Sequence, residues 1–379
     1  MFGGSDTEGA GGPRRRRPVR LALIVLLVLA LPAGFVACRA AERSTAGPAP
    51  PPRPSDIPST LGGSASPEAT DKGWHKPKPP AKKCKVTAIA EPTCGAWWGI
   101  SLGEYELTGL ERTVGRKFDI VYEWHGVDQP AVPTDGELAR SRQGRFLHVN
   151  VEARRFLQPG HPAVRYSEII NGHFDGPLKA QAKRFGKAGQ KVFVTFDHEA
   201  DAKTRYNVRG TPAEFVAAWR HIVDLYRKHG ADNVVFVWNV TGWSGNFGKL
   251  PGLWPGNDYV DWLSWEGYNM SACRPEQKAV LSFDAAVRPM YDWVQRHGPD
   301  HGIDRDKPVM ISEMGTTSLG GHTADWYRAI PGTLRDLPRI RAVKLWNERV
   351  GPCDFRLPVT GGLGAFTAAG ADPYLNHAH

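Results

Sequence analysis

Two segments of this 379-residue chain place a glutamate directly after an apolar run of the kind that forms a buried β-strand. They are residues 196–201, FDHEAD, and residues 310–315, MISEMG, and their glutamates are Glu199 and Glu313. In a parallel barrel the C-terminal ends of all strands surround one pocket, so the two side chains could face each other there. Two carboxyl groups across a pocket can cleave a glycosidic bond, because one protonates the leaving oxygen while the other stabilises or attacks the sugar carbon.

The chain from residue 95 onward alternates strand-like apolar runs with amphipathic stretches, which predicts a parallel sheet with crossover helices. Thr211 and Ser282 are predicted N-caps of helices over 212–229 and 283–297, each followed by a glycine. Eight such units fit an α/β fold of the (β/α)8 TIM-barrel type. A doubly wound open sheet is the alternative, although no Gly-x-Gly-x-x-Gly turn follows the first strand. The predicted strands cover residues 96–102, 118–124, 146–151, 192–197, 234–240, 259–267, 308–313 and 342–347.

The first 83 residues differ in composition from the rest. Residues 1–20 form a basic tail with Arg14 to Arg17, and residues 21–38 form an apolar transmembrane anchor or signal segment. The positive-inside rule places the tail in the cytoplasm and everything after Cys38 outside. Cys38 ends a partial lipoprotein cleavage box, so cleavage, lipidation and retention stay open. Residues 39–83 form a Pro-rich linker, and the barrel domain covers residues 84–379.

Most of the net charge of +9 lies in this N-terminal region, and only +2 remains for residues 84–379. The folded part therefore has no basic patch for nucleic acid, and we expect a monomer. Four cysteines follow the membrane segment without metal-binding spacing, which favours disulfides in an exported domain. The predicted pairs are Cys84 with Cys94 and Cys273 with Cys353. We therefore expect the folded domain to be extracytoplasmic, either membrane-anchored or secreted at the cell surface.

The predicted strand ends are rich in acids and aromatic residues, which suit sugar binding because rings cover C–H faces while acids and amides bind hydroxyls. Spacing alone does not select the catalytic pair. Seven acids could reach the pocket: Glu123, Asp197, Glu199, Asp201, Glu266, Glu313 and Glu348. The candidate substrate-binding residues from these ends are Trp124, His125, His198, Asn239, Trp243, Trp265, Tyr268 and Trp346, whereas Trp238, Trp262 and Trp293 are expected in the core.

Several ordered motifs over residues 95–375 make the chain resemble glycoside hydrolase family 26, the clan A barrel family that includes β-mannanases. The motifs are FDHE at 196–199, TPAEF at 211–215, VWN at 237–239, YVDW at 259–262, GYN at 267–269, KPVMISE at 307–313 and WN at 346–347. The resemblance implies a retaining enzyme in which Glu199 is the acid/base and Glu313 the nucleophile. It also implies that Tyr268 hydrogen-bonds the nucleophile and that Trp346 lies under the sugar.

Two departures from the family pattern concern the substrate. The loop after Glu199 begins Ala200-Asp201 where mannanases commonly have Met-Asn-Gly, and Glu266 stands where an aspartate is usual. The first expectation is an endo-acting β-1,4-mannanase; β-1,3-xylan and mixed-linkage β-glucan stay open. A non-catalytic carbohydrate-binding surface protein is the rival from another class, and a transglycosylase would use the same residues. Two carboxylic acids suffice for the reaction, so no metal or organic cofactor is expected.

Overall fold

The computed structural model describes residues 84–202, 208–271, 273–274, 277–318, 321–357 and 359–376. Eight parallel strands form a closed barrel in chain order, with β1 paired to both β2 and β8. The predicted (β/α)8 barrel is therefore confirmed, and the open-sheet alternative is wrong because the sheet has no edge. The strands are β1 (Trp97–Ser101), β2 (Ile120–Gly126), β3 (Phe146–Glu152), β4 (Val192–Phe196), β5 (Val234–Val240), β6 (Trp262–Asn269), β7 (Val309–Thr316) and β8 (Ile340–Trp346).

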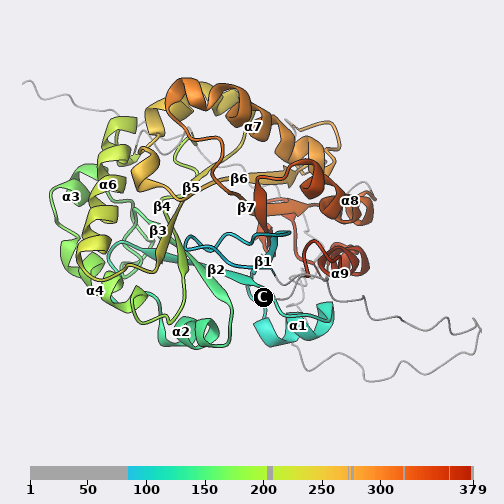
Figure 1. Cartoon of the computed structure of the whole chain (residues 1–379), viewed down its shortest axis with the longest axis horizontal. Helices are drawn as coiled ribbons and strands as arrows, with labels where there is room; N and C mark the ends of the chain where they lie inside the picture. The colour runs from blue at the N-terminus through green and yellow to red at the C-terminus, as the bar shows by residue number, and fades with distance from the viewer. Residues whose placement is uncertain are drawn as a thin grey trace, which may run out of the picture. The chain divides into compact units, whose positions relative to one another are not determined.

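Helices surround the barrel, as Figure 1 shows, and their apolar faces pack on the outward-facing residues of the strands. The loops between these elements contain short 3-10 helices and a two-stranded hairpin. The helices are α1 (Leu107–Val114), α2 (Asp135–Arg142), α3 (Tyr166–Ile170), α4 (Asp175–Phe185), α6 (Pro212–Lys228), α7 (Phe283–His297), α8 (Thr323–Asp336) and α9 (Leu363–Gly370). The short elements are η1 (Ser244–Leu253), η2 (Asn257–Tyr259), η3 (Pro299–His301), β9 (Arg349–Val350) and β10 (Cys353–Asp354).

Helix α6 begins where its sequence predicts. The Thr211 side chain accepts from the backbone N–H of Glu214, whose carboxylate accepts from the N–H of Thr211, so a capping box closes the first turn. Ser282 caps α7 through the N–H of Ala285 in the same way. Both helices end within one residue of the predicted positions, because capping side chains and the following glycines act locally.

The N-terminal end of the barrel is closed by apolar packing. Trp97 and Trp262 are fully buried there, together with Phe193 and Met310. The indole N–H groups of the two tryptophans donate to the carbonyls of Ala90 and Ile89, at 2.8 and 2.7 Å. The Cys84–Cys94 disulfide closes the loop that holds those carbonyls. In barrels of this type, sites lie at the opposite end, where the strands have their C-terminal ends.

The second disulfide, Cys273–Cys353, joins the segment after β6 to β10 across 80 positions of sequence. Its sulfurs pack with Phe355 against Tyr268 and Trp346. Both predicted pairings are confirmed. They agree with an extracytoplasmic location, since disulfides persist in oxidising compartments.

The basic tail, the apolar segment with Cys38 and the Pro-rich linker lie outside the described residues. Across the part of the chain that the structure does describe, every helix is too short or too polar to cross a bilayer.

Candidate active site

Glu313, on β7, has a buried carboxyl group at the open end of the barrel. The hydroxyl of Tyr268, on β6, donates to its Oε2 at 2.8 Å. The Nε2 atom of His198 lies 3.8 Å from its Oε1. Burial raises the pKa of Glu313 above its usual value, while His198 and the Tyr268 hydrogen bond act in the opposite direction. The contact that the family resemblance implies between Tyr268 and Glu313 is thus present.

Glu199 lies in a turn that continues β4, and the backbone of this turn is unusual. Asp197 and Glu199 both have positive φ, at 49° and 53°, which non-glycine residues rarely adopt. Asp197 is fully buried and accepts hydrogen bonds from the Tyr166 hydroxyl at 2.6 Å and the Ala153 N–H at 3.2 Å. Arg209 also pairs with its carboxylate. These contacts hold the turn in place, so Asp197 is an anchor and not a pocket acid.

His198 lies between the ends of β3 and β7. Its backbone N–H donates to Oδ1 of Asn150 at 3.3 Å, and its ring Nδ1 lies 2.8 Å from Nδ2 of the same asparagine. The carboxylate of Glu152 is 3.3 Å from that ring nitrogen. Asn150 and Glu152 were missed by the sequence reasoning. The alternation of His148, Asn150 and Glu152 along an otherwise apolar strand was the available signal, because these side chains share one face of β3.

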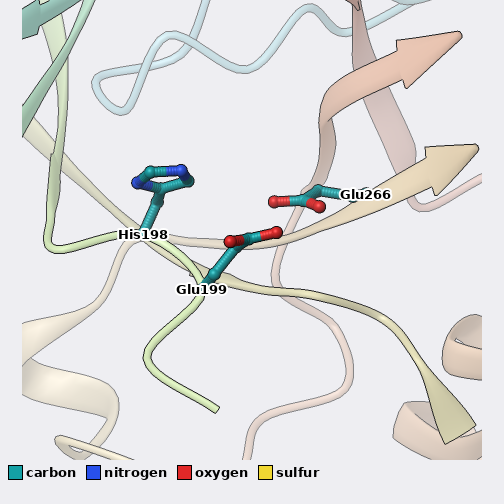
Figure 2. Close-up of side chains that lie close together, drawn as sticks. All are labelled: His198, Glu199 and Glu266. Atoms are coloured by element: carbon teal, nitrogen blue, oxygen red, sulfur yellow. The ribbon is translucent and has the colours of Figure 1, made fainter. Parts of the chain in front are cut away.

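Glu266, on β6, adds a third carboxyl group to those of Glu199 and Glu313. Figure 2 shows its carboxyl group directed toward that of Glu199, with the His198 ring beside them. One ring nitrogen of His198, one carboxylate oxygen of Glu199 and one of Glu266 all lie within 4.8 Å of one another. Burial raises the pKa of Glu266 well above its usual value, and the charges of Glu199 and Glu313 raise it further. Burial and the neighbouring carboxylates thus both favour the protonated form of Glu266.

Asn239, on β5, is buried beside the turn of Glu199. Its Oδ1 accepts from the backbone N–H of Glu199 at 3.3 Å, and its Nδ2 donates to the Ser264 hydroxyl at 3.0 Å. The Ser264 hydroxyl in turn contacts the Ser312 hydroxyl, next to Glu313. Each end of its amide thus binds a protein group, and a contact between Asn239 and substrate stays a prediction. Asn239 links the segments that carry Glu199 and Glu313.

A buried polar layer lies one level deeper in the barrel. Lys344, on β8, is fully buried, and its Nζ contacts Nδ1 of His148 and lies 3.2 Å from the centre of the Tyr122 ring. Nε2 of His148 is 2.8 Å from the Thr195 hydroxyl. Burial lowers the pKa of Lys344 well below its usual range, whereas the charge of Glu313 raises it. Lys344 thus couples electrostatically to Glu313, which nothing in its local sequence indicated.

The predicted aromatic residues are in different environments. The rings of Trp124 and Trp346 are half-buried at the site, nearly perpendicular with centres 4.7 Å apart, and Trp124 also lies 6.2 Å from His198. Trp265 is fully buried in the main core, so the prediction that it binds sugar is wrong. Trp243 follows β5 and is 67% exposed. Among the residues expected in the core, Trp238 and Trp262 are buried and Trp293 is partly buried.

Two residues near the end of β2 point away from the pocket. His125 Nε2 lies 2.7 Å from a carboxylate oxygen of Glu137 on α2, and Glu123 pairs with Arg140 on the same helix. Side chains alternate along a strand, so the inward positions belong to Tyr122 and Trp124. The prediction that His125 contacts substrate is therefore wrong.

Asp201 is fully buried beyond the turn of Glu199. It accepts from the N–H and hydroxyl of Thr241 at 2.9 and 2.5 Å, and from Nδ2 of Asn246 at 3.1 Å. It fastens the loop after β4 to the loop that carries Trp243 and is not available to a substrate. The seventh acid, Glu348, accepts from the Ser101 hydroxyl at 3.0 Å.

The sequence is similar to those of curated proteins that act on polysaccharides. The chain is 26% identical over 279 residues to Endoglucanase H of Acetivibrio thermocellus, which covers 69% of this chain and 28% of that protein. It is 24% identical over 147 residues to the β-1,3-xylanase TXYA of a Vibrio species, covering 38% of this chain and 28% of the relative. The chain thus spans less than a third of the length of these curated relatives. No family model matches it.

Among solved structures, a GH26 β-mannanase from Bacteroides ovatus superimposes with a TM-score of 0.55 at 14% identity, over 76% of this chain and 91% of that one. GH26C from a Muricauda species gives the same TM-score at 13% identity, over 75% and 87% of the two chains. The predicted resemblance to glycoside hydrolase family 26 is confirmed. The barrel of this chain has Glu199 after its fourth strand and Glu313 on its seventh, at the positions of the family motifs in the sequence.

Proposed function

We propose that the chain is a retaining glycoside hydrolase that cleaves a β-linked polysaccharide by double displacement, with Glu313 as nucleophile and Glu199 as acid/base. The hydrogen bond from the Tyr268 hydroxyl to Oε2 of Glu313 carries this proposal. It fixes the carboxylate, while Oε1 has no hydrogen-bond partner in the described part of the chain. In the proposed reaction, this oxygen attacks the sugar carbon.

The first step needs Glu313 charged and Glu199 protonated. The nearby His198 and the Tyr268 hydroxyl both favour the charged form of Glu313. Glu199 gives its proton to the glycosidic oxygen as the bond from the anomeric carbon to that oxygen breaks and the ester to Glu313 forms. Water then attacks the anomeric carbon and loses a proton to Glu199, which releases Glu313.

The substrate is the finer part of the proposal. β-1,4-Mannan, cleaved internally, is the first candidate because the sequence motifs resemble those of β-mannanases. Mixed-linkage β-glucan is the second, and the likeness to Endoglucanase H over 69% of the chain favours it. β-1,3-Xylan is the third, from the shorter likeness to a β-1,3-xylanase. The exposed Trp243 ring and the half-buried Trp124 and Trp346 rings offer apolar faces for neighbouring sugars.

Hydrolysis of a panel of the three polysaccharides tests this function. We expect release of reducing ends from one of them, with retention of anomeric configuration in the first product observed by NMR. Glu313→Ala should abolish release while still binding the polysaccharide. Glu348→Gln, which removes a carboxyl from the same rim outside the catalytic group, should stay active. An inverted product would rule out double displacement, and binding without hydrolysis by the unmodified chain would favour the carbohydrate-binding alternative.

We further propose that the protein acts as a monomer outside the cytoplasm, on polysaccharide at or near the cell surface. The two disulfides support this location. Mass spectrometry of the mature N-terminus decides whether residues 21–38 are retained, cleaved or lipidated at Cys38.

A further inference from the structure

Glu266 is directed into the catalytic group by an irregularity of the sheet. In the pairing of β6 with β7, Trp265 lies opposite Ile311, but Glu266 lies opposite Glu313, so the register shifts between Trp265 and Glu266. Such bulges re-aim side chains, and they occur preferentially next to active sites. The bulge thus places a third carboxyl group beside Glu199 and Glu313, although the two-glutamate reaction needs only two.

The surroundings of Glu266 are dominated by acids. Its carboxyl is hydrogen-bonded to that of Glu199, and the charges of Glu313 and Asp201 also act on it. Its Oε1 is buried and has no hydrogen-bond partner among the described atoms. The remaining titratable groups that face it are His198 from the β4 turn, Tyr268 from its own strand and Tyr122 from β2.

A second negative charge beside Glu199 would be costly in this buried place while Glu313 is also charged. The two hydrogen-bonded carboxyl groups must therefore hold a proton between them. Such a pair titrates as one unit, not as two separate acids.

We propose that Glu266 is a positioning and proton-sharing partner of Glu199, and that the two carboxyl groups keep one proton available for the leaving group for as long as Glu313 is charged. This inference rests on the proposed function. When Glu313 forms its ester, its negative charge disappears, and the shared proton leaves with the glycosidic oxygen. The pair then carries two negative charges. It regains its proton from the attacking water as the ester breaks and the charge returns to Glu313, so charge and protons balance over the cycle.

The test compares the unmodified chain with Glu266→Gln, which keeps a hydrogen-bonding group but cannot share a proton. Without the second carboxyl group, only the charge of Glu313 opposes deprotonation of Glu199, so Glu199 loses its proton at lower pH. The alkaline limb of the pH profile of kcat/KM should then move to lower pH by about one unit or more. Glu266→Asp should restore part of the shift, and Glu348→Gln should leave the limb in place.

Substrates with different leaving groups separate proton supply from simple structural damage. An aryl glycoside whose phenol leaves as a stable anion needs no proton, so Glu266→Gln should hydrolyse it at least ten times better, relative to the unmodified chain, than it hydrolyses the polysaccharide. Equal losses on both substrates would overturn the inference.

A direct measurement makes the outcome independent of activity. Infrared titration follows the C=O band of protonated carboxyl groups without any substrate. We expect the alkaline midpoint of this band to fall by about one pH unit or more in Glu266→Gln. An unchanged midpoint overturns the proton sharing even if the enzyme is active. If the midpoint shifts but the unmodified chain cleaves no glycan, the proton sharing is supported and the proposed function is refuted instead.

Discussion

Replacing Tyr268 with phenylalanine removes one hydroxyl and tests the assignment of Glu313. The hydroxyl donates to Oε2 of Glu313 at 2.8 Å and favours the charged carboxylate. A hydrogen bond to a charged group contributes roughly 1.5–3 kcal/mol. Since one pKa unit corresponds to about 1.4 kcal/mol, its loss should raise the pKa of Glu313 by about one to two units. The nucleophile would then become protonated, and inactive, at a higher pH than in the unmodified chain.

The pH profile of kcat/KM on the cleaved polysaccharide measures this shift, because it reports ionisations of the free enzyme. The acid limb should move upward by about one to two pH units in Tyr268→Phe. Tyr327→Phe is the matched control, since Tyr327 lies on α8 and its buried hydroxyl makes no hydrogen bond within the described residues. An acid limb that stays in place, or moves equally in the control, would refute the assignment of Glu313 as the group held by Tyr268.

Three other outcomes follow from the structure. Cys353→Ser opens the disulfide that packs against Tyr268 and Trp346, and should lower the free energy of unfolding by about 2–4 kcal/mol in urea denaturation; Cys273→Ser should match it, and unequal losses would argue against this pairing. Thr211→Ala removes the capping box of α6 and should cost about 1 kcal/mol in the same assay, while an unchanged midpoint would mean that the cap adds no stability. Dialysis against a chelator should leave hydrolysis unchanged, since two carboxylic acids suffice for the reaction, and activity restored by an added cation would contradict the mechanism.

The order of the strands was predictable because local sequence controls it, whereas some strand ends differ from the prediction: β6 covers Trp262–Asn269 where 259–267 was predicted. Apolar runs, N-caps and glycines act over a few residues, so α6 and α7 begin at their predicted positions. The family motifs also located Glu199, Tyr268 and Glu313, because they join a chemical group to a fixed place in a strand.

Side-chain direction at the strand ends was not predictable from the strand assignments alone. His125 binds Glu137 on a helix, and Trp265 lies in the core, although both follow apolar runs just as Glu199 does. A one-residue register difference reverses the face on which a side chain lies. The bulge before Glu266 depends on the pairing of two strands that are far apart in sequence, with Trp265 opposite Ile311 and Glu266 opposite Glu313.

The sequence by itself determined the barrel, the disulfide partners and the two glutamates of the proposed reaction. Tertiary structure alone decided which polar groups surround them: Asn150 against His198, Lys344 near Glu313, and Glu266 against Glu199. Each of these contacts joins different strands, so it exists only when the barrel closes. The charge that a carboxyl group carries depends on burial and on those neighbours. The sequence marked Glu266 only as one of seven candidate acids and as a departure from the family pattern, and the role that we propose for it comes from its surroundings in the closed barrel.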